Sequence, residues 1–265
     1  MSPAIETIAL TRRFGSFTAV NNLNLSVKPG AIFGLLGPNG AGKSTAIKML
    51  TTLLPPTSGT AKVAGFDIIE SPVEVRKRIG YVPQMLSADG SLTAFENLSL
   101  SAKLHGMAKV ERKMRIQEAL NFSGLAEVAG KLVKTYSGGM IRRLELAQAM
   151  LHHPAVLFLD EPTIGLDPVA RKAVWERLQA LRREYGMTIL LTTHDMEEAD
   201  YLCDELAILY QGRINVTGSP MALKNSVGAA ATLDDVFVEY SGGTIQESGS
   251  YREVRQARHT LERLG

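Results

Sequence analysis

The chain contains a single cysteine, Cys203, among its 265 residues. One cysteine excludes an internal disulfide framework and fits a reducing compartment. Aromatic residues make up only 6% of the chain, which argues against the stacked aromatic platforms that bind single-stranded nucleic acids. An excess of one charge is also missing, because 29 basic residues face 27 acidic residues for a net charge of +2. We therefore expect no nucleic-acid partner.

Long hydrophobic runs are absent as well. A membrane-spanning helix needs about 18 or more consecutive apolar residues, whereas an apolar run such as residues 155–159 has the length of a strand. The first residues show neither the basic segment nor the apolar stretch of a secretory signal. We expect a chain without a signal peptide or a transmembrane segment. Its 45% hydrophobic and 21% charged residues are typical of a globular protein and exclude disorder.

Hydrophobic patterning predicts an α/β fold with a mostly parallel sheet. Residues 5–36 are predicted to form strands, and the continuous apolar run at 31–36 is typical of a strand buried on both faces. Alternating strand and helix patterns continue along the chain. The further strands are expected at 60–66, 79–82, 156–159, 188–192 and 206–209, and the helices of the core at 43–54, 73–78 and 169–185.

Three parts are predicted from these patterns. Residues 1–83 and 154–215 form the core, which includes an N-terminal antiparallel β subdomain. Residues 84–153 form an inserted helical lobe, because helical patterns at 93–104, 108–122 and 140–153 follow one another without a convincing strand. Residues 216–265 form a C-terminal appendage.

The appendage has a glycine-rich break at 241–243 and ends in a basic amphipathic stretch at 251–264. This stretch suits either a solvated surface helix or a contact with a membrane surface or partner.

A glycine-rich loop between a predicted buried strand and a helix matches the pattern G-x-x-x-x-G-K-[ST]. Glycines let backbone N–H groups point at an anion, and the start of the helix adds positive potential. Lys43 can reach the β- and γ-phosphates of a nucleotide, and the hydroxyl of Ser44 can bind Mg²⁺. The predicted phosphate loop consists of Gly37, Pro38, Asn39, Gly40, Ala41, Gly42, Lys43, Ser44 and Thr45.

Two carboxylates follow the apolar run at 155–159. Asp160 and Glu161 are thus expected at the carboxyl end of a buried strand, where open α/β sheets bind their ligands. Asp160 would hold the metal ion, directly or through water. Glu161 is placed to polarise an attacking water. A strand that ends in Asp-Glu is a weak signal alone, but it is strong beside a phosphate loop.

A second anion-binding helix start is predicted at Ser137-Gly138-Gly139. Ser137 is a natural N-cap, and the two glycines leave backbone N–H groups open. In isolation this motif is more often a linker or an ordinary cap. Beside a phosphate loop it suggests a shared site, in which one copy covers the γ-phosphate bound by another copy in a symmetric pair.

These motifs, in this order, resemble those of the nucleotide-binding subunits of ABC transporters, over roughly residues 5–220. Gln84 matches the glutamine loop of that family, Asp167 the D-loop and His194 the switch histidine. Phe14 lies where the family places an aromatic ring that stacks on adenine. The resemblance implies a P-loop NTPase core and the two cofactors ATP and Mg²⁺.

The resemblance also implies a role for each matched residue. Gln84 would sense the metal or water and face the membrane subunit, and His194 would contact the γ-phosphate. Asp167 would communicate across the dimer, and the 137–139 motif would bind the opposite γ-phosphate. In the predicted site, Glu161, His194, Gln84 and Lys43 are catalytic, and Ser44, Gln84 and Asp160 hold the metal.

Two positions depart from the usual signature of the family, which begins with leucine and ends with glutamine. Here Tyr136 and Met140 take those places, and methionine cannot copy the polar contact of the glutamine. The form Tyr-Ser-Gly-Gly-Met resembles the subgroup of daunorubicin-type drug-resistance exporters, and so does the segment at 232–237.

We therefore expect an ATPase subunit of an exporter that pairs with a second copy and drives a separate membrane permease from the cytoplasmic face of the membrane. Met85, Leu86, Leu92 and Phe95 would line an apolar groove for a permease helix or pack the lobe's own core. Two other functions stay open, a soluble non-transport ABC-type ATPase and a small-molecule kinase. The kinase would leave the 137–139 motif without a purpose.

Overall fold

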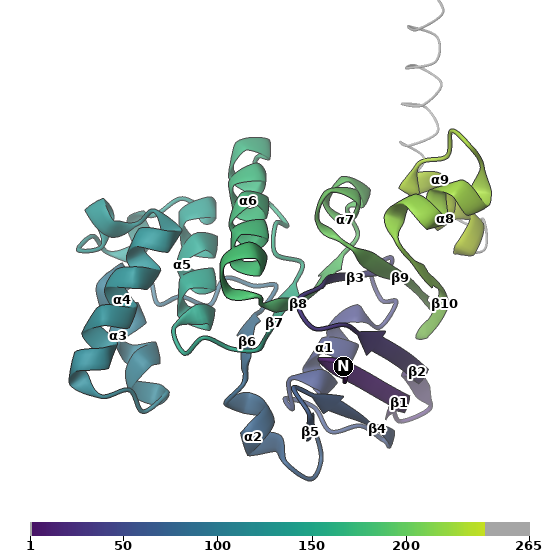
Figure 1. Ribbon diagram of the computed structural model, residues 1–265, viewed down its shortest axis with the longest axis horizontal. Coiled ribbons are helices and arrows are strands. Elements are labelled where there is room, and N and C mark those ends of the chain that lie inside the picture. Colours follow the sequence, from purple (N-terminus) through teal and green to yellow (C-terminus); the bar gives the residue numbers. More distant parts are fainter. Residues whose placement is uncertain (1, 242–265) are drawn as a thin grey trace, which may run out of the picture.

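The computed structural model describes residues 2–241. The basic stretch expected at 251–264 and the glycines of the expected break at 242–243 lie outside the described residues. Two sheets and a group of helices form the described part of the chain (Figure 1). No helix among residues 2–241 has the length and apolar character that a bilayer span requires.

The first sheet is antiparallel and forms the expected N-terminal β subdomain. Its strand order is β2-β1-β4-β5. A two-residue turn joins its first two strands, and Gly15 in that turn has a φ of 58°, which glycine adopts without strain. Its strands are β1 (Ile5–Phe14), β2 (Phe17–Val27), β4 (Ser58–Val63) and β5 (Phe66–Asp67).

The second sheet is the core of the molecule, with strand order β10-β9-β3-β8-β7-β6. All neighbours pair in parallel except β9 and β10, which are antiparallel. The mostly parallel sheet predicted from the sequence is therefore confirmed. Its strands are β3 (Ile32–Leu36), β6 (Ile79–Val82), β7 (Val156–Asp160), β8 (Thr188–Thr193), β9 (Glu205–Tyr210) and β10 (Arg213–Gly218).

Successive residues of these strands point to opposite faces of the sheet, and each face has its own hydrophobic core. Phe33 and Leu35 pack with α1 (Lys43–Leu50) and the antiparallel sheet. Ile32 and Leu36 pack on the other side with α6 (Pro168–Tyr185) and α7 (Met196–Leu202). Burial on both faces explains why the parallel strands are almost continuously apolar.

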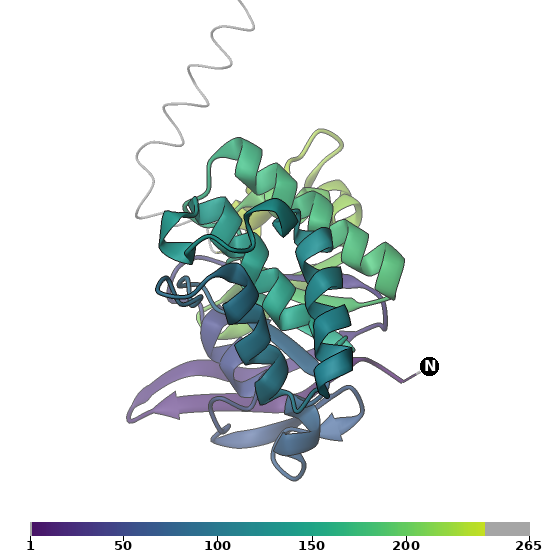
Figure 2. The ribbon, with the colours of Figure 1, turned by 90° about the vertical axis from the view of Figure 1, so that its left-hand side faces the viewer.

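The helical lobe has a hydrophobic core of its own. It is built from α3 (Ala94–Leu104), α4 (Lys109–Ser123) and α5 (Gly138–Met150), with the short 3₁₀ turns η1 (Ala126–Val128) and η2 (Val133–Thr135). Thr93 and Glu96 form a capping box that begins α3. Figure 2 shows the lobe from its outer side, in front of the core.

Helix α1 is shorter than the expected helix at 43–54. It ends at Leu50 because Thr52 adopts a φ of 62°, which a right-handed helix does not allow. The next helix is α2 (Pro72–Arg76). The expected helix at 140–153 instead begins at Gly138 and ends at Met150.

The C-terminal part that the structure describes is packed against the core. It consists of α8 (Pro220–Val227) and α9 (Leu233–Tyr240). Leu233 and Val236 of α9 are buried in the hydrophobic cluster that also contains Ile32 and Leu36 of β3. The expected domain boundary at 215–216 falls inside β10, and the division into three parts stays a prediction.

Candidate active site

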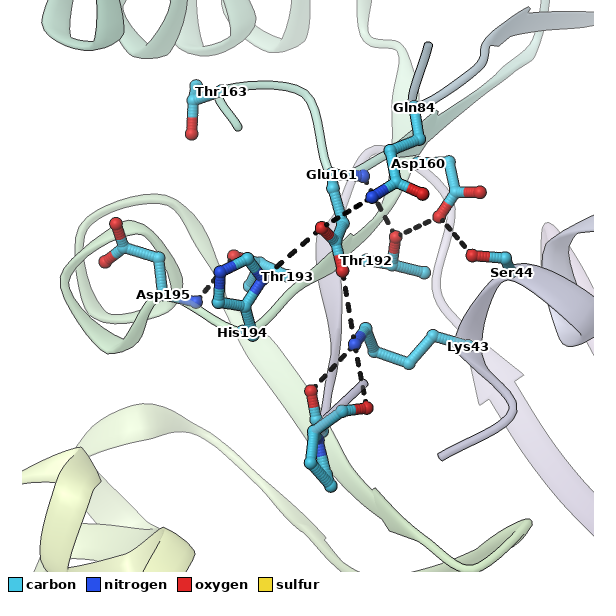
Figure 3. A network of polar contacts seen from close by, with 12 residues as sticks. Lys43, Ser44, Gln84, Asp160, Glu161, Thr163, Thr192, Thr193, His194 and Asp195 are labelled. Carbon is cyan, nitrogen blue, oxygen red and sulfur yellow. Dashed lines mark hydrogen bonds and ion pairs between the residues drawn. The ribbon is translucent and has the colours of Figure 1, made fainter. Parts of the chain in front are cut away.

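Four parallel strands end at the same edge of the central sheet. Their ends bring Lys43, Gln84, Glu161 and His194 together (Figure 3). The phosphate loop follows β3, Gln84 follows β6, Glu161 follows β7 and His194 follows β8. The register aligns these ends, because Asp160 pairs with Thr192 in the neighbouring strand. The carboxyl ends of parallel strands share one edge of a sheet, so residues distant in sequence become neighbours there.

The phosphate loop depends on glycine at two positions where the backbone lies close to other strands. A Cβ atom on Gly37 would overlap the carbonyl oxygen of Leu209, and one on Gly42 would overlap that of Ala19. Gly42 also has a φ of 106° and is the N-cap of α1. The loop therefore keeps its backbone N–H groups accessible at the start of a helix, which suits an anion.

Lys43 is buried at the centre of the loop, with 4% of its surface exposed. Its Nζ donates to the carbonyl oxygens of Gly37 at 2.7 Å and Pro38 at 3.1 Å. The ammonium also lies 3.3 Å from Glu161 Oε1. Burial lowers the pKa of Lys43, while the charges of Glu161 and Asp160 act in the opposite direction.

Asp160 is held by two hydroxyl groups. Ser44 Oγ donates to Asp160 Oδ1 at 3.0 Å, and Thr192 Oγ1 donates to the same oxygen at 2.6 Å. The carboxylate of Asp160, the hydroxyl of Ser44 and the amide oxygen of Gln84 are hard oxygen ligands of the kind that Mg²⁺ takes. No three His, Cys, Asp or Glu side chains gather as a metal site within residues 2–241. A Mg²⁺ here would complete its shell with phosphate oxygens and water, as it usually does.

Glu161 contacts three other predicted residues of the site, Lys43, Gln84 and His194. Its carboxylate accepts from Gln84 Nε2 at 3.2 Å and lies 3.3 Å from His194 Nδ1. The hydrogen bond from His194 lowers the pKa of Glu161, with Lys43 adding to this effect against the opposing effect of burial. The same hydrogen bond raises the pKa of His194. The contacts therefore favour an ionised carboxylate at neutral pH.

The backbone of Glu161 is strained, since its φ is 50° and the residue is not glycine. Such a conformation costs on the order of 1–3 kcal/mol and persists only where the surroundings impose it. Here the Glu161 N–H donates to the carbonyl oxygen of Thr192 at 3.1 Å and to Thr192 Oγ1 at 3.0 Å. These bonds turn the chain after β7 and aim the carboxylate at Lys43 and His194.

The 137–139 motif lies apart from this network. Ser137 is the N-cap of α5 and accepts from Met140 N at 3.3 Å, and Gly139 packs against Ala170 of α6. Asp167 is the N-cap of α6 and accepts from the N–H groups of Val169 and Ala170. Ser137, Gly138 and Asp167 are exposed to solvent. The chain thus presents a second helix start that its own Lys43 and Glu161 do not use.

Residues 20–164 match the family model described as ABC transporter. The chain belongs to the ABC transporter family. In this family it is an ATP-binding subunit and an ATPase.

The chain is similar to several known members. It is 45% identical to the daunorubicin/doxorubicin resistance ATP-binding protein of Streptomyces peucetius, over 85% of this chain and 68% of that one. It is 41% identical to a probable multidrug ABC transporter ATP-binding protein of Escherichia coli K12, over 89% of this chain but only 41% of that longer relative. The fold also matches a dimeric ATP-binding cassette in a post-hydrolysis state with ADP and Pi. That match has a TM-score of 0.73 and 27% identity, and it covers 81% of this chain and 98% of the other.

The two departures from the usual ABC signature have a structural explanation. Tyr136 is buried in the core of the helical lobe, and its hydroxyl donates to the carbonyl oxygen of Val128 at 2.7 Å. Met140 packs against the edge of the same core. Both side chains therefore serve the packing of this ABC subunit's lobe, whereas Ser137 stays exposed.

Phe14, the predicted adenine-stacking residue, lies at the end of β1, with 47% of its surface exposed. The guanidinium carbon of Arg12 lies 4.7 Å from its ring centroid. The ring therefore packs against a cation within its own strand, and its role toward adenine stays a prediction for this ABC subunit.

Two buried polar residues of this ABC subunit were not predicted from the sequence, and one of them, Thr192, supports the site. Thr192 joins Asp160 to the backbone of Glu161, as described above. Glu198 of α7 is 1% exposed and accepts from Thr163 Oγ1 at 2.7 Å and from Trp175 Nε1 at 3.0 Å. In the sequence, both Thr192 and Glu198 are polar residues at positions that the periodicity of the strand or helix predicts to be buried. That mismatch is the one feature that could have indicated them.

Proposed function

We propose that this chain is the ATP-hydrolysing subunit of a drug-resistance-type exporter and that two copies close on two Mg-ATP. The observation that carries the proposal is the placement of Glu161. Its carboxylate lies within 3.3 Å of Lys43 Nζ, of His194 Nδ1 and of Gln84 Nε2. One ionised carboxylate, one phosphate-binding lysine and one imidazole thus converge at the mouth of the phosphate loop, as water attack on a γ-phosphate requires.

The residues of the site divide the work of phosphoryl transfer. Lys43 and the backbone N–H groups of residues 37–45 neutralise charge on the β- and γ-phosphates, which is the main catalytic effect in this reaction. Asp160, Ser44 and Gln84 would hold a Mg²⁺, which would supply positive charge to neutralise the phosphates. Glu161 orients and polarises the attacking water, and the His194 imidazole donates a hydrogen bond toward the γ-phosphate.

A second copy would complete the site. Ser137 and Gly138 are exposed at the start of α5, where the helix dipole favours an anion. The similarity to a dimeric cassette with ADP and Pi supports this arrangement. In the symmetric pair, Ser137 and the exposed backbone of Gly138 bind the γ-phosphate held by the other copy, while Gly139 is buried against Ala170 of α6. Asp167 caps α6, whose Ala170 lies against Gly139, so it would face the same interface.

Three exposed apolar side chains after Gln84 support a membrane permease as the other partner. Met85, Leu86 and Phe95 are 82%, 49% and 48% exposed, respectively. They follow Gln84 in the chain, whereas Ala94 and Leu98 fill the core of the lobe beside them. Exposed apolar side chains that follow Gln84 so closely in the chain suit contact with a partner helix. The chain would then act as a peripheral subunit at the cytoplasmic face of the membrane, with the permease as a separate protein.

The substitution Glu161→Gln tests the shared site. We expect it to abolish hydrolysis while ATP accumulates in a stable pair, because the amide keeps the shape but cannot accept a proton. Size-exclusion chromatography with saturating Mg-ATP measures the pair. The matched control is Glu161→Gln with Ser137→Ala, which should stay monomeric. A Glu161→Gln protein that is monomeric with bound ATP would refute the shared site.

Affinity purification from membranes of the source cell tests the transport partner. A permease recovered with the wild-type chain, and lost when Met85 and Phe95 are replaced by serine, would support an exporter. Recovery of the chain with cytosolic partners alone would favour the non-transport ATPase.

A further inference from the structure

Arg142 and Glu145 form a buried ion pair on α5. Arg142 Nη1 lies 3.0 Å from Glu145 Oε2, and the residues are 1% and 3% exposed. Charged side chains are almost never buried this deeply unless they are paired, and a well-packed apolar pair often stabilises a fold equally well. Stability alone therefore does not explain why this buried ion pair is present. Its hydrogen bonds to a neighbouring loop offer another explanation.

Arg142 holds the loop that carries Gln84. Its Nη1 donates to the carbonyl oxygen of Pro83 at 2.7 Å, and its Nη2 donates to that of Gln84 at 2.8 Å. The guanidinium is planar and presents its donors in a rigid fork, so it fixes the direction of both carbonyls at once. The side chain of the same Gln84 donates to Glu161 Oε2.

Glu145 holds the far end of the same loop. Its Oε1 accepts from the backbone N–H of Ser87 and from Ser87 Oγ, the latter at 3.0 Å. Because Arg142 and Glu145 are three residues apart, they lie on one face of α5. The segment 83–87 is thus bound to this helix at both ends.

The same helix begins at the motif that faces the other copy. Ser137 caps α5, and continuous backbone hydrogen bonds make the helix a rigid body. A shift of the 83–87 backbone would therefore be passed to α5 and to Ser137 at its start. We propose that Arg142 and Glu145 are positioning residues that couple Gln84 at one nucleotide site to Ser137 at the site shared with the second copy. This inference rests on the two-copy ATPase proposed above.

The test replaces the ion pair by an apolar pair, Arg142→Met with Glu145→Leu. This double variant leaves no unpaired buried charge, but it removes the hydrogen-bond partners of the Pro83 and Gln84 carbonyls and of Ser87, so it should fold and unfold at a somewhat lower temperature than the wild type. We expect ATP affinity of the monomer to change by less than about threefold, because Lys43 and its loop are untouched. We expect kcat to fall by about 10²-fold, the scale of a 1 Å misplacement in an active site. The Hill coefficient for ATP should fall to 1.

A second variant covers the case in which the double variant does not fold. Arg142→Lys keeps the charge beside Glu145, but a single ammonium lacks the fork that holds both carbonyls. We expect a folded protein with reduced kcat and reduced cooperativity and with unchanged ATP affinity.

The matched control lies in the same lobe. Arg115 and Glu118 of α4 are another Arg-Glu pair at three-residue spacing, 3.2 Å apart and partly exposed. Arg115→Met with Glu118→Leu should leave kcat and the Hill coefficient as in the wild type.

The outcomes separate this inference from the function on which it rests. Wild-type kcat and cooperativity in a folded Arg142→Lys or double variant would overturn the coupling role. They would leave the ATPase intact. If the wild type hydrolyses ATP without cooperativity and Glu161→Gln never pairs, the two-copy site itself is refuted.

Discussion

His194 Nδ1 lies 3.3 Å from Glu161 Oε2, so the two side chains form an ion pair whenever the imidazole is protonated. The pair raises the pKa of His194 above its ordinary value of 6.5 and helps to lower that of Glu161 below 4.5. Its stabilisation is therefore fully present between these two ordinary values. It is lost as the pH rises through the raised pKa of His194, and as the pH falls through the lowered pKa of Glu161.

NMR titration of the imidazole protons tests this pairing. Glu161→Gln should lower the pKa of His194 toward 6.5, because the partner charge is gone. The internal control is His152, whose burial lowers its pKa to about 4 and which should titrate unchanged in the variant. An unchanged pKa of His194 in Glu161→Gln would show that the two side chains do not interact in solution.

Thr192→Val should impair both stability and catalysis. The substitution keeps the shape of the side chain but removes the hydroxyl that joins Asp160 to the Glu161 N–H. Losing these bonds should cost about 1–3 kcal/mol in the free energy of unfolding, and kcat should fall at least tenfold as the carboxylates lose their alignment. Urea unfolding and steady-state ATPase assays measure the two effects.

Thr188→Val is the matched control for Thr192→Val. Thr188 lies in the same strand and accepts from Gly30 N at 2.9 Å, away from the carboxylates. Thr188→Val should lower the free energy of unfolding but leave kcat unchanged. An equal loss of kcat in both variants would mean that the hydroxyl of Thr192 has no special role in the site.

Gly139→Ala should destabilise the chain even without nucleotide. A Cβ on Gly139 would lie 2.8 Å from Ala170 Cβ, so α5 and α6 would have to move apart. Overpacking of this kind typically costs about 1–3 kcal/mol. The companion change Ala170→Gly should recover part of the loss, measured as a favourable coupling energy in a double-mutant cycle.

Gly138→Ala provides the comparison for Gly139→Ala, since its added Cβ would lie 3.5 Å from Leu166 Cδ2, an ordinary contact. Thermal unfolding of the two variants without nucleotide should therefore differ. Equal unfolding temperatures would contradict the packing of Gly139 against α6.

Tyr136→Phe should weaken the helical lobe without changing the shared site. It removes the hydroxyl that donates to the Val128 carbonyl oxygen, a bond worth about 1 kcal/mol. Pairing of the Glu161→Gln protein by ATP should be unaffected, because Ser137 and the backbone of the motif are untouched. A large loss of ATP-dependent pairing would instead assign this tyrosine to the interface.

Much of the predicted fold follows from local patterns. The continuous apolar runs predicted parallel strands because burial on both faces leaves no polar positions, and Gly37 to Thr45 were found because a phosphate loop needs glycine, lysine and serine at set spacing. Helix ends were less predictable. Thr52 ends α1 through a left-handed backbone that its residue type does not announce.

The sequence by itself predicted which residues form the site, since the phosphate loop, Gln84, Glu161 and His194 each come shortly after a predicted strand and parallel strands end at one edge. Only the tertiary structure decided how they are held. Glu161 is held in a left-handed backbone conformation. The hydroxyl of Thr192 joins the carboxylate of Asp160 to the backbone N–H of Glu161, and Arg142 binds the carbonyl oxygen of Pro83. These hydrogen bonds join segments that lie far apart in the chain. Such contacts depend on strand register and on the packing of the lobe against the core, which no local pattern encodes.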